Sequence, residues 1–299
     1  MKLHNIIIIC VLISFNLNAQ EKKNPSFALN FGQSSQNTFT KAKPAQLIAT
    51  FPANDTIANS FLINGFVEGA LNWERDDKFS YSIGIAYEVQ KNTLISNEQD
   101  VKQFGLTASQ IITNDYEDSK GQYILSQNLK ISENFITDKK ALQAHLGFKY
   151  EDFRSNSLFY VDAPIPLIGT KSAPDQLLSF RWDYDLGLGY IGGDEEVLFG
   201  KASFSVSAFP FYGLLKKAFK QPEIIFVTYK LDSRAPFIGD TDLDINPLRS
   251  LSTGLSYVIN DTNKLLLAYT WNKGANPFSG LINQEYSTLT VQFKINLKN

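Results

Sequence analysis

His145 is the first residue to consider for catalysis, because the only other histidine lies at position 4. A hydrolase of the Ser-His-acid type would have to use His145 as its general base. Residues 141–151 alternate between apolar and polar side chains, and His145 falls on the polar side with Gln143 and Lys149. The next position on that side is Gly147, which offers no nucleophile. We therefore expect a solvated interior histidine and no enzymatic activity.

An acidic cluster from Asp240 to Asp244, followed by Asn246, is the best candidate for a metal site. Its alternate carboxylates resemble the start of a calcium loop, which needs several hard oxygen ligands. Ile245 stands where such a loop requires glycine, and no acidic residue follows at the closing position. The chain also lacks the Walker, dinucleotide-binding and zinc-protease motifs. We expect a solvated loop, no metal ion and no cofactor.

Charged side chains recur on the polar side of the alternating segments, where they would face a shared interior. Arg181, Asp183 and Asp185 lie on one segment, and Lys149 and Lys201 lie on the segments expected beside it, which predicts internal ion pairs. Opposite charges could cross-link a narrow interior and close it, or they could line a small polar channel. The residues expected to line this interior are Glu68, Glu88, Lys130, His145, Lys149, Glu151, Arg181, Asp183, Asp185, Lys201, Lys230 and Lys294.

The elements that must position these residues are β-strands, because apolar and polar residues alternate with a period of two. The alternation is clear in residues 79–90, 141–151, 178–190, 250–259, 265–271 and 289–297. It is less clean in 61–73, 196–209 and 222–232, weak in 101–113 and 121–132, and 44–52 is a plausible first strand. About twelve strands result. The fold class expected is all-β, an antiparallel transmembrane up-and-down β-barrel. The proline-bearing region 153–176 is expected to contain either an additional strand or a specialised connection.

The first nineteen residues have the features of an export signal that is cleaved. Lys2 is followed by a ten-residue apolar run, Ile6 to Phe15, and Ala19 is a small residue suited to the cut. The only cysteine, Cys10, lies inside this run, so the rest of the chain has no disulfide or Cys-ligated metal. The domains expected are a signal peptide at 1–19, a leader at 20–43, within which 27–31 alternates like a short strand, and a barrel at 44–299.

Strand length and aromatic placement favour a membrane barrel over an exported soluble β protein. Residues 61–73 keep a largely apolar face, and at roughly 3.3 Å per residue and a tilt of about 40° they span about 30 Å. That length is comparable to the apolar band of an outer membrane. Aromatic residues gather at the ends of the apolar faces, as in an interfacial girdle: Phe61, Trp73, Tyr87, Tyr150, Tyr190, Tyr257 and Trp271.

The signal ending Asn-Ala-Gln, the long amphipathic strands and the final strand Leu289–Leu297 resemble the porin-like outer-membrane β-barrels of Gram-negative bacteria. The resemblance covers most of residues 44–299 and is one of pattern. Many such barrels end in phenylalanine, whereas this chain ends Leu297-Lys298-Asn299. The resemblance implies an outer-membrane location, contact with lipid and lipopolysaccharide, and insertion by the barrel-assembly machinery.

Three functions follow from that resemblance. The first is porin-like passage of small polar solutes. The second is a non-conducting barrel with a scaffold, surface-binding or secretion-associated role. The third is a lipid-modifying hydrolase, since outer-membrane barrel phospholipases are similar in size, although His145 faces away from lipid. A nucleic-acid partner is not expected, because the formal net charge is −2.

Overall fold

The computed structural model describes residues 25–32, 46–50, 60–76, 78–93, 98–116, 119–154, 165–168, 176–193, 196–239, 245–259 and 264–294. These residues are almost entirely β-strand. The strands are β1 (Ser26–Gly32), β2 (Gln46–Thr50), β3 (Ser60–Asp76), β4 (Phe79–Asn92), β5 (Gln99–Tyr116), β6 (Ser119–Asn134), β7 (Lys139–Asp152), β8 (Ile165–Ile168), β9 (Leu178–Gly192), β10 (Glu196–Pro210), β11 (Ile225–Ile238), β12 (Leu248–Val258), β13 (Lys264–Asn276) and β14 (Leu281–Lys294). A helix, α2 (Tyr212–Phe219), and a 3-10 turn, η2 (Pro277–Ser279), complete the elements.

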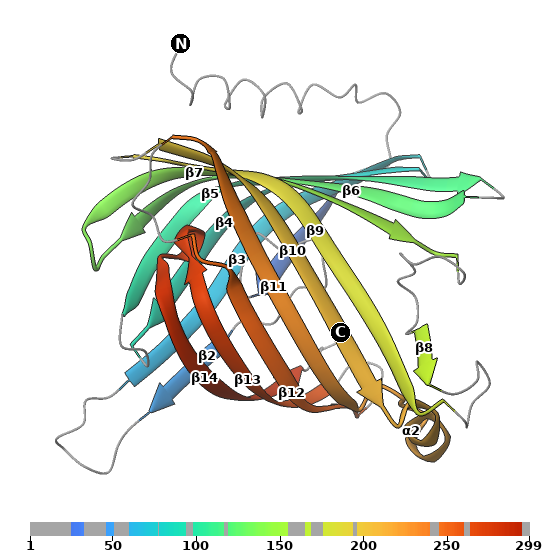
Figure 1. Ribbon diagram of the computed structural model, residues 1–299. Coiled ribbons are helices and arrows are strands. Elements are labelled where there is room, and N and C mark those ends of the chain that lie inside the picture. Colours follow the sequence, from blue (N-terminus) through green and yellow to red (C-terminus); the bar gives the residue numbers. More distant parts are fainter. Residues whose placement is uncertain are drawn as a thin grey trace.

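The strands form one antiparallel up-and-down sheet in which chain neighbours are sheet neighbours (Figure 1). The order is β1-β3-β4-β5-β6-β7-β9-β10-β11-β12-β13-β14, which gives twelve strand positions. β1 and β2 pair with successive parts of β3, since Gly32 pairs with Phe66 and Gln46 with Asn64. They therefore act as two halves of one edge strand. The expected all-β, up-and-down architecture of about twelve strands is confirmed.

The sheet curves strongly but is not closed by hydrogen bonds, since no pairing joins β14 to β1 or β2 among the described residues. The strand directions nevertheless suit closure. Twelve antiparallel positions make the first and last strands run in opposite directions, so they can pair in the same antiparallel manner as the others. The architecture is thus compatible with a barrel.

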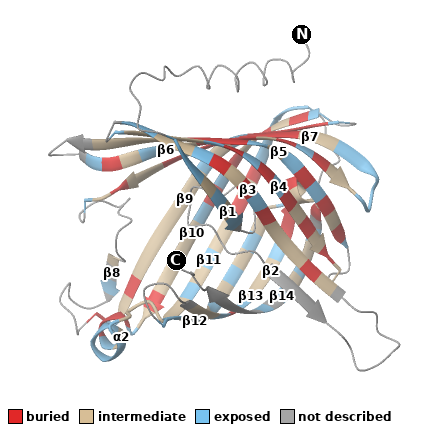
Figure 2. Cartoon of the chain, turned by 180° about the vertical axis from the view of Figure 1, so that it is seen from behind, coloured by how far each residue is buried: buried red, intermediate tan, exposed pale blue. Residues whose placement is uncertain are grey.

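Alternation along the strands sorts side chains between two surfaces (Figure 2). In β4 the large apolar residues Ile83, Ile85 and Tyr87 are exposed on the convex surface, while Glu88 and Gln90 are buried on the concave surface. The pattern is that of a β-barrel whose outside is apolar and whose inside is polar. It inverts the usual distribution of a soluble domain, in which charged residues are the exposed ones.

The two ends of the sheet carry different connections. The first strand begins and β14 ends at what we call the terminal end, which also holds α2 and the link from β7 to β9. β8 lies within that link and pairs with β9, so region 153–176 does contain a short additional strand. The opposite end, here called the plug end, holds the β9–β10, β11–β12 and β13–β14 connections. No helix in the described part of the chain is long and apolar enough to cross a membrane.

Several boundaries differ from those expected. The weak segments 101–113 and 121–132 belong to two of the longest strands, β5 and β6. β1 lies within the expected leader, at the alternating residues 27–31. Residues 273–284 contain the turn residues Pro277 and Gly280 but are mostly strand around η2. The signal peptide, most of the leader, the cluster Asp240–Asp244 and residues 295–299 lie outside the described residues.

Candidate functional site

The concave surface of the sheet gathers the charged residues that the sequence placed in an interior. Glu88, His145, Lys149 and Lys201 are buried there. Glu151, Arg181, Asp183, Asp185 and Lys230 are half-buried on the same surface, and the side chain of Lys294 lies outside the described part of the structure. The sheet therefore brings these residues together by register. It also buries Gln103, Asn128, Asp232 and Arg234 among them, which the sequence did not single out.

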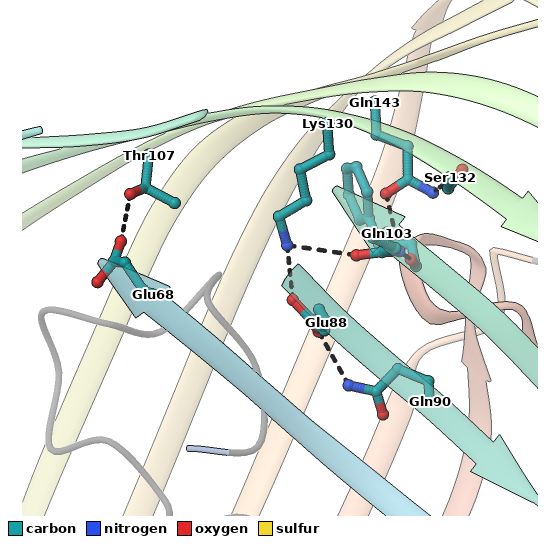
Figure 3. Close-up of polar contacts among 9 residues, drawn as sticks. Glu68, Glu88, Gln90, Gln103, Thr107, Lys130, Ser132 and Gln143 are labelled. Carbon is teal, nitrogen blue, oxygen red and sulfur yellow. Dashed lines mark hydrogen bonds and ion pairs between the residues drawn. The ribbon is translucent and has the colours of Figure 1, made fainter. Parts of the chain in front are cut away.

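One wall of this surface carries a hydrogen-bonded network across β4 to β7, and a separate hydrogen bond joins β5 to β3 (Figure 3). The Lys130 ammonium lies 2.6 Å from the Glu88 carboxylate and donates to Gln103 Oε1 at 3.2 Å. Gln90 donates to Glu88 at 2.9 Å. Nearby, Gln143 donates to Ser132 at 3.0 Å, and Thr107 donates to Glu68. The ion pair and the hydrogen bonds offset part of the cost of burying Glu88 and Lys130.

The other wall, from β7 to β11, carries ion pairs of which only one matches the sequence prediction. Lys149 lies 2.7 Å from Asp183, as expected, and 2.6 Å from Glu151. Arg181 pairs instead with Glu223, just before β11, at 2.8 Å. Asp185 and Lys201 form no ion pair with any described residue. Lys230 pairs with Asp232 at 3.1 Å, a contact between two positions of one strand face.

A turn from the plug end folds onto this surface; we call residues 275–281 the plug. Ala275 near the end of β13, Phe278 in η2 and Leu281 at the start of β14 are all buried. Gln99 and Gln103 of β5 donate hydrogen bonds to the backbone oxygens of Ser279 and Phe278. Arg234 of β11 donates to the Ala275 oxygen at 3.2 Å and to Asn276 Oδ1 at 3.0 Å. The plug thus crosses the concave surface from β13–β14 to β5.

Phe278 anchors the plug in a small apolar cluster. Its ring is 1% exposed and lies with its centroid 5.2 Å from that of Phe199 and 6.1 Å from that of His145, edge-on to the imidazole. Gly189 makes room for both phenylalanines, since a Cβ there would lie 2.7 Å from Phe278 Cζ and 2.6 Å from Phe199 Cε2. Ile191 and Val197 complete the cluster. An aromatic side chain of the plug therefore packs against the concave surface.

Polar atoms directly beneath the plug lack hydrogen bonds to the described residues. They are both ring nitrogens of His145, both amide atoms of Asn128, and Arg234 Nε. His145 therefore has no serine or carboxylate relay within hydrogen-bond distance in the described part of the chain, and the geometry assembles no Ser-His-acid triad. No group of three metal-ligating side chains occurs among the described residues either.

The aromatic residues expected at the ends of the apolar surface differ in exposure. Tyr87 and Tyr257 are exposed on the convex surface, and Phe61, Trp73, Tyr150 and Trp271 are half-buried. Tyr190 does not fit an outward-facing girdle, because it is 2% exposed. Its hydroxyl lies over Gly192, where a Cβ would be 2.2 Å away, so the absence of a side chain at 192 lets the ring fold along the sheet. The alternation of residues 178–190 alone could not predict that Tyr190 is buried.

The described residues define a class of protein: an all-β chain with a twelve-position up-and-down sheet compatible with a barrel, apolar on its convex surface and polar on its concave one. Comparison of the sequence with protein-family models and with curated proteins finds no match. The functional argument therefore rests on the residues and their geometry.

Proposed function

We propose that this protein is a β-barrel of a bacterial outer membrane whose polar lumen admits small polar solutes past the plug. The observation that carries the proposal is the inverted burial of the sheet. Large apolar side chains such as Leu251 and Leu289 are 44% and 65% exposed on the convex surface, whereas Glu88 and Lys130 are buried on the concave one. An aqueous surface rarely carries so extensive an apolar area, while a lipid bilayer requires one.

Closure of the sheet is part of the proposal. A sheet edge in the hydrocarbon would leave backbone donors and acceptors unpaired, which is costly, so spanning sheets close into barrels. The opposed directions of the first strand and β14 permit that closure. The signal-like residues 1–19 support export, and outer-membrane lipid, lipopolysaccharide and the barrel-assembly machinery are the partners that such a location implies.

The plug favours a second candidate function, a non-conducting barrel with a scaffold, surface-binding or secretion-associated role. Phe278 and the hydrogen bonds from Gln103 and Arg234 hold the turn across the concave surface. Ion pairs such as Lys149–Asp183 occupy more of the same space. A lumen filled in this way conducts only if the plug moves.

Conductance in planar bilayers tests the proposal directly. The purified protein should give discrete current steps that are small for a twelve-position barrel, because the plug narrows the lumen. Silence in the wild type and in a variant lacking the Phe278 ring, with insertion verified separately, would reject solute passage and favour the non-conducting barrel.

Leu251→Arg should destabilise the folded protein in lipid vesicles, because it places a charge on the surface assigned to hydrocarbon. The expected loss is about 2–4 kcal/mol if residue 251 lies near the bilayer midplane. Ser250→Arg, on the adjacent concave position, is the matched control and should cost much less. Urea-dependent unfolding in vesicles, followed by tryptophan fluorescence, measures both. Equal losses for the two variants would contradict the assignment of surfaces.

A further inference from the structure

The polar atoms beneath the plug form a coherent group. Asn128 on β6 pairs in register with His145 on β7, which pairs in turn with Gly189 on β9. In the next row, Gly147 pairs with Gly187, Gly187 with Lys201, and Lys201 with Arg234. The unpartnered atoms of His145, Asn128 and Arg234 thus lie in two adjacent rows that face the plug.

His145 leans toward the second of these rows. A Cβ on Gly147 would lie 3.1 Å from His145 Cε1, and a Cβ on Gly187 would lie 3.1 Å from His145 Nε2. The imidazole therefore covers two positions that have no side chain, and both of its nitrogens are shut off from solvent. Buried donors and acceptors left unpaired are unfavourable, so this arrangement favours a polar partner once the plug moves.

The charges around this group favour an anion as that partner. Three cations, Lys130, Lys201 and Arg234, lie near enough to His145 to act on it electrostatically. Lys130 is bonded to Glu88, but Lys201 makes no hydrogen bond or ion pair with the described residues. Asp185, one row closer to the terminal end, also lacks an ion pair within the described structure. It and Asp232 are the acids that act electrostatically on Lys201, and Asp185 Oδ1 lacks a hydrogen-bond partner among the described residues.

The other acids toward the terminal end already form ion pairs. Asp183 and Glu151 contact Lys149, and Asp232 contacts Lys230 and accepts a hydrogen bond from Ser203. The cationic excess is therefore local to the rows beneath the plug. Displacing the plug would also release the two Arg234 hydrogen bonds to Ala275 and Asn276.

We propose that Lys201, Arg234, His145 and Asn128 form a binding site for a small anion, and that the plug covers this site. The anion accepts hydrogen bonds from the ammonium, the guanidinium, the amide and the imidazole N–H once Phe278 withdraws. The inference rests on the proposed function, because it assigns the class of solute that the lumen prefers.

Reversal potentials across a KCl gradient test the site, with chloride as the probe anion. Phe278→Ala should conduct with a several-fold preference for chloride over potassium, and adding Lys201→Gln should remove most of it. Lys273→Gln is the matched control, since Lys273 is an exposed residue paired with Glu285 outside the lumen, and it should leave the preference unchanged. Phe278→Leu is a milder replacement should the alanine variant not fold.

The outcomes distinguish failure of the anion site from failure of solute passage. Conductance without anion preference, or a preference that survives Lys201→Gln, would overturn the anion site while leaving solute passage intact. Absence of conductance in every correctly inserted variant would overturn solute passage itself, and the site with it.

A second feature, helix α2, carries an independent inference. Phe211, Leu214 and Phe219 at this helix are large apolar residues that remain exposed. Helical spacing places Leu214, Leu215, Ala218 and Phe219 on one side, and Lys216, Lys217 and Lys220 on the other. All three lysines are exposed. Figure 1 shows α2 at one end of the sheet, beside the ends of β9 and β10.

We infer that α2 lies in the interface of the adjacent leaflet and binds anionic phospholipid headgroups. The helix follows β10 after Phe211, and both elements expose large apolar residues: Phe204 on the convex surface of β10, and Leu214 and Phe219 on the helix. Short helices with an apolar side and a basic side bind membranes in this way, and their lysines attract anionic lipids.

Spin labels at single cysteines test the position of α2 in the full chain with Cys10→Ser. In vesicles containing phosphatidylglycerol, a label at Leu214→Cys should be more accessible to oxygen than to a water-soluble nickel complex, and a label at Lys217→Cys should show the reverse. Replacing all three lysines with glutamine, or using phosphatidylcholine alone, should weaken the burial at 214. Equal nickel accessibility at both sites, in a protein whose convex strand labels are in lipid, would overturn the inference for α2 alone.

Discussion

Phe278→Ala should raise the single-channel conductance of the reconstituted protein several-fold. The ring of Phe278 is the part of the plug that projects into the cluster with Phe199 and edge-on to His145. Without it, the plug keeps the smaller apolar contacts of Ala275 and Leu281 and its hydrogen bonds with Gln99, Gln103 and Arg234, which exchange readily with water. Single-channel recording at fixed voltage measures the change.

A second variant that displaces the plug distinguishes this effect from a general loss of structure in Phe278→Ala. Truncating a buried phenylalanine costs about 3–5 kcal/mol, so folding of Phe278→Ala must be checked by gel mobility before and after heating. Gly189→Ala leaves the plug sequence intact but introduces a Cβ where Phe278 Cζ would lie 2.7 Å away. It should also increase conductance. Unchanged conductance in both folded variants would show that the plug does not limit passage.

Lys130→Met should destabilise the barrel by about 3–5 kcal/mol, because it leaves the buried Glu88 carboxylate without its cation. Lys130 and Glu88 are 2.6 Å apart and both nearly fully buried. The loss also breaks the hydrogen bond to Gln103, which in turn donates to the plug. Urea unfolding in vesicles, compared with the wild type, measures the effect.

The double variant Glu88→Leu/Lys130→Met separates an uncompensated charge from lost packing. Removing both partners of a buried ion pair often restores much of the stability lost by removing one. We therefore expect the double variant to be more stable than Lys130→Met. Lys140→Met, which loses an exposed pair with Glu133, should change stability little. A double variant less stable than Lys130→Met would contradict a pairwise role for this contact.

The strands could be predicted because a two-surface sheet imposes a period of two on its sequence. Glu88 and Lys149, which each lie within a cleanly alternating segment, are buried in the structure. β5 and β6 gave a weak signal since positions such as Gln110 and Gln127 place polar residues where the alternation calls for apolar ones.

The plug could not be predicted, because its inward fold depends on contacts between residues far apart in the sequence. Phe278 follows Pro277 in a connection rich in turn residues, which resembles an exposed loop. Its partners Gln103 and Phe199 are distant along the chain, and Gly189 contributes by lacking a side chain. A large aromatic residue inside a short Pro/Gly turn was the available signal.

The ion pairs were only partly predictable for a related reason. The alternation along a strand places a residue on one surface of the sheet, but it does not fix which residue of the neighbouring strand lies beside it. Arg181 pairs with Glu223, which lies before β11, at the start of segment 222–232, where the alternation is less clean. Lys201 faces Gly187 and Arg234 instead of an acid.

The orientation of the convex surface toward lipid is the central claim, and spin-label accessibility on β12 tests it most directly. Leu255 is exposed on the convex surface and Ser256 faces the concave one. In vesicles, a label at Leu255→Cys should collide with oxygen more than with a water-soluble nickel complex, and a label at Ser256→Cys should be less accessible to oxygen than the label at 255. Ready access of the nickel complex to residue 255, in correctly folded protein, would contradict a membrane barrel.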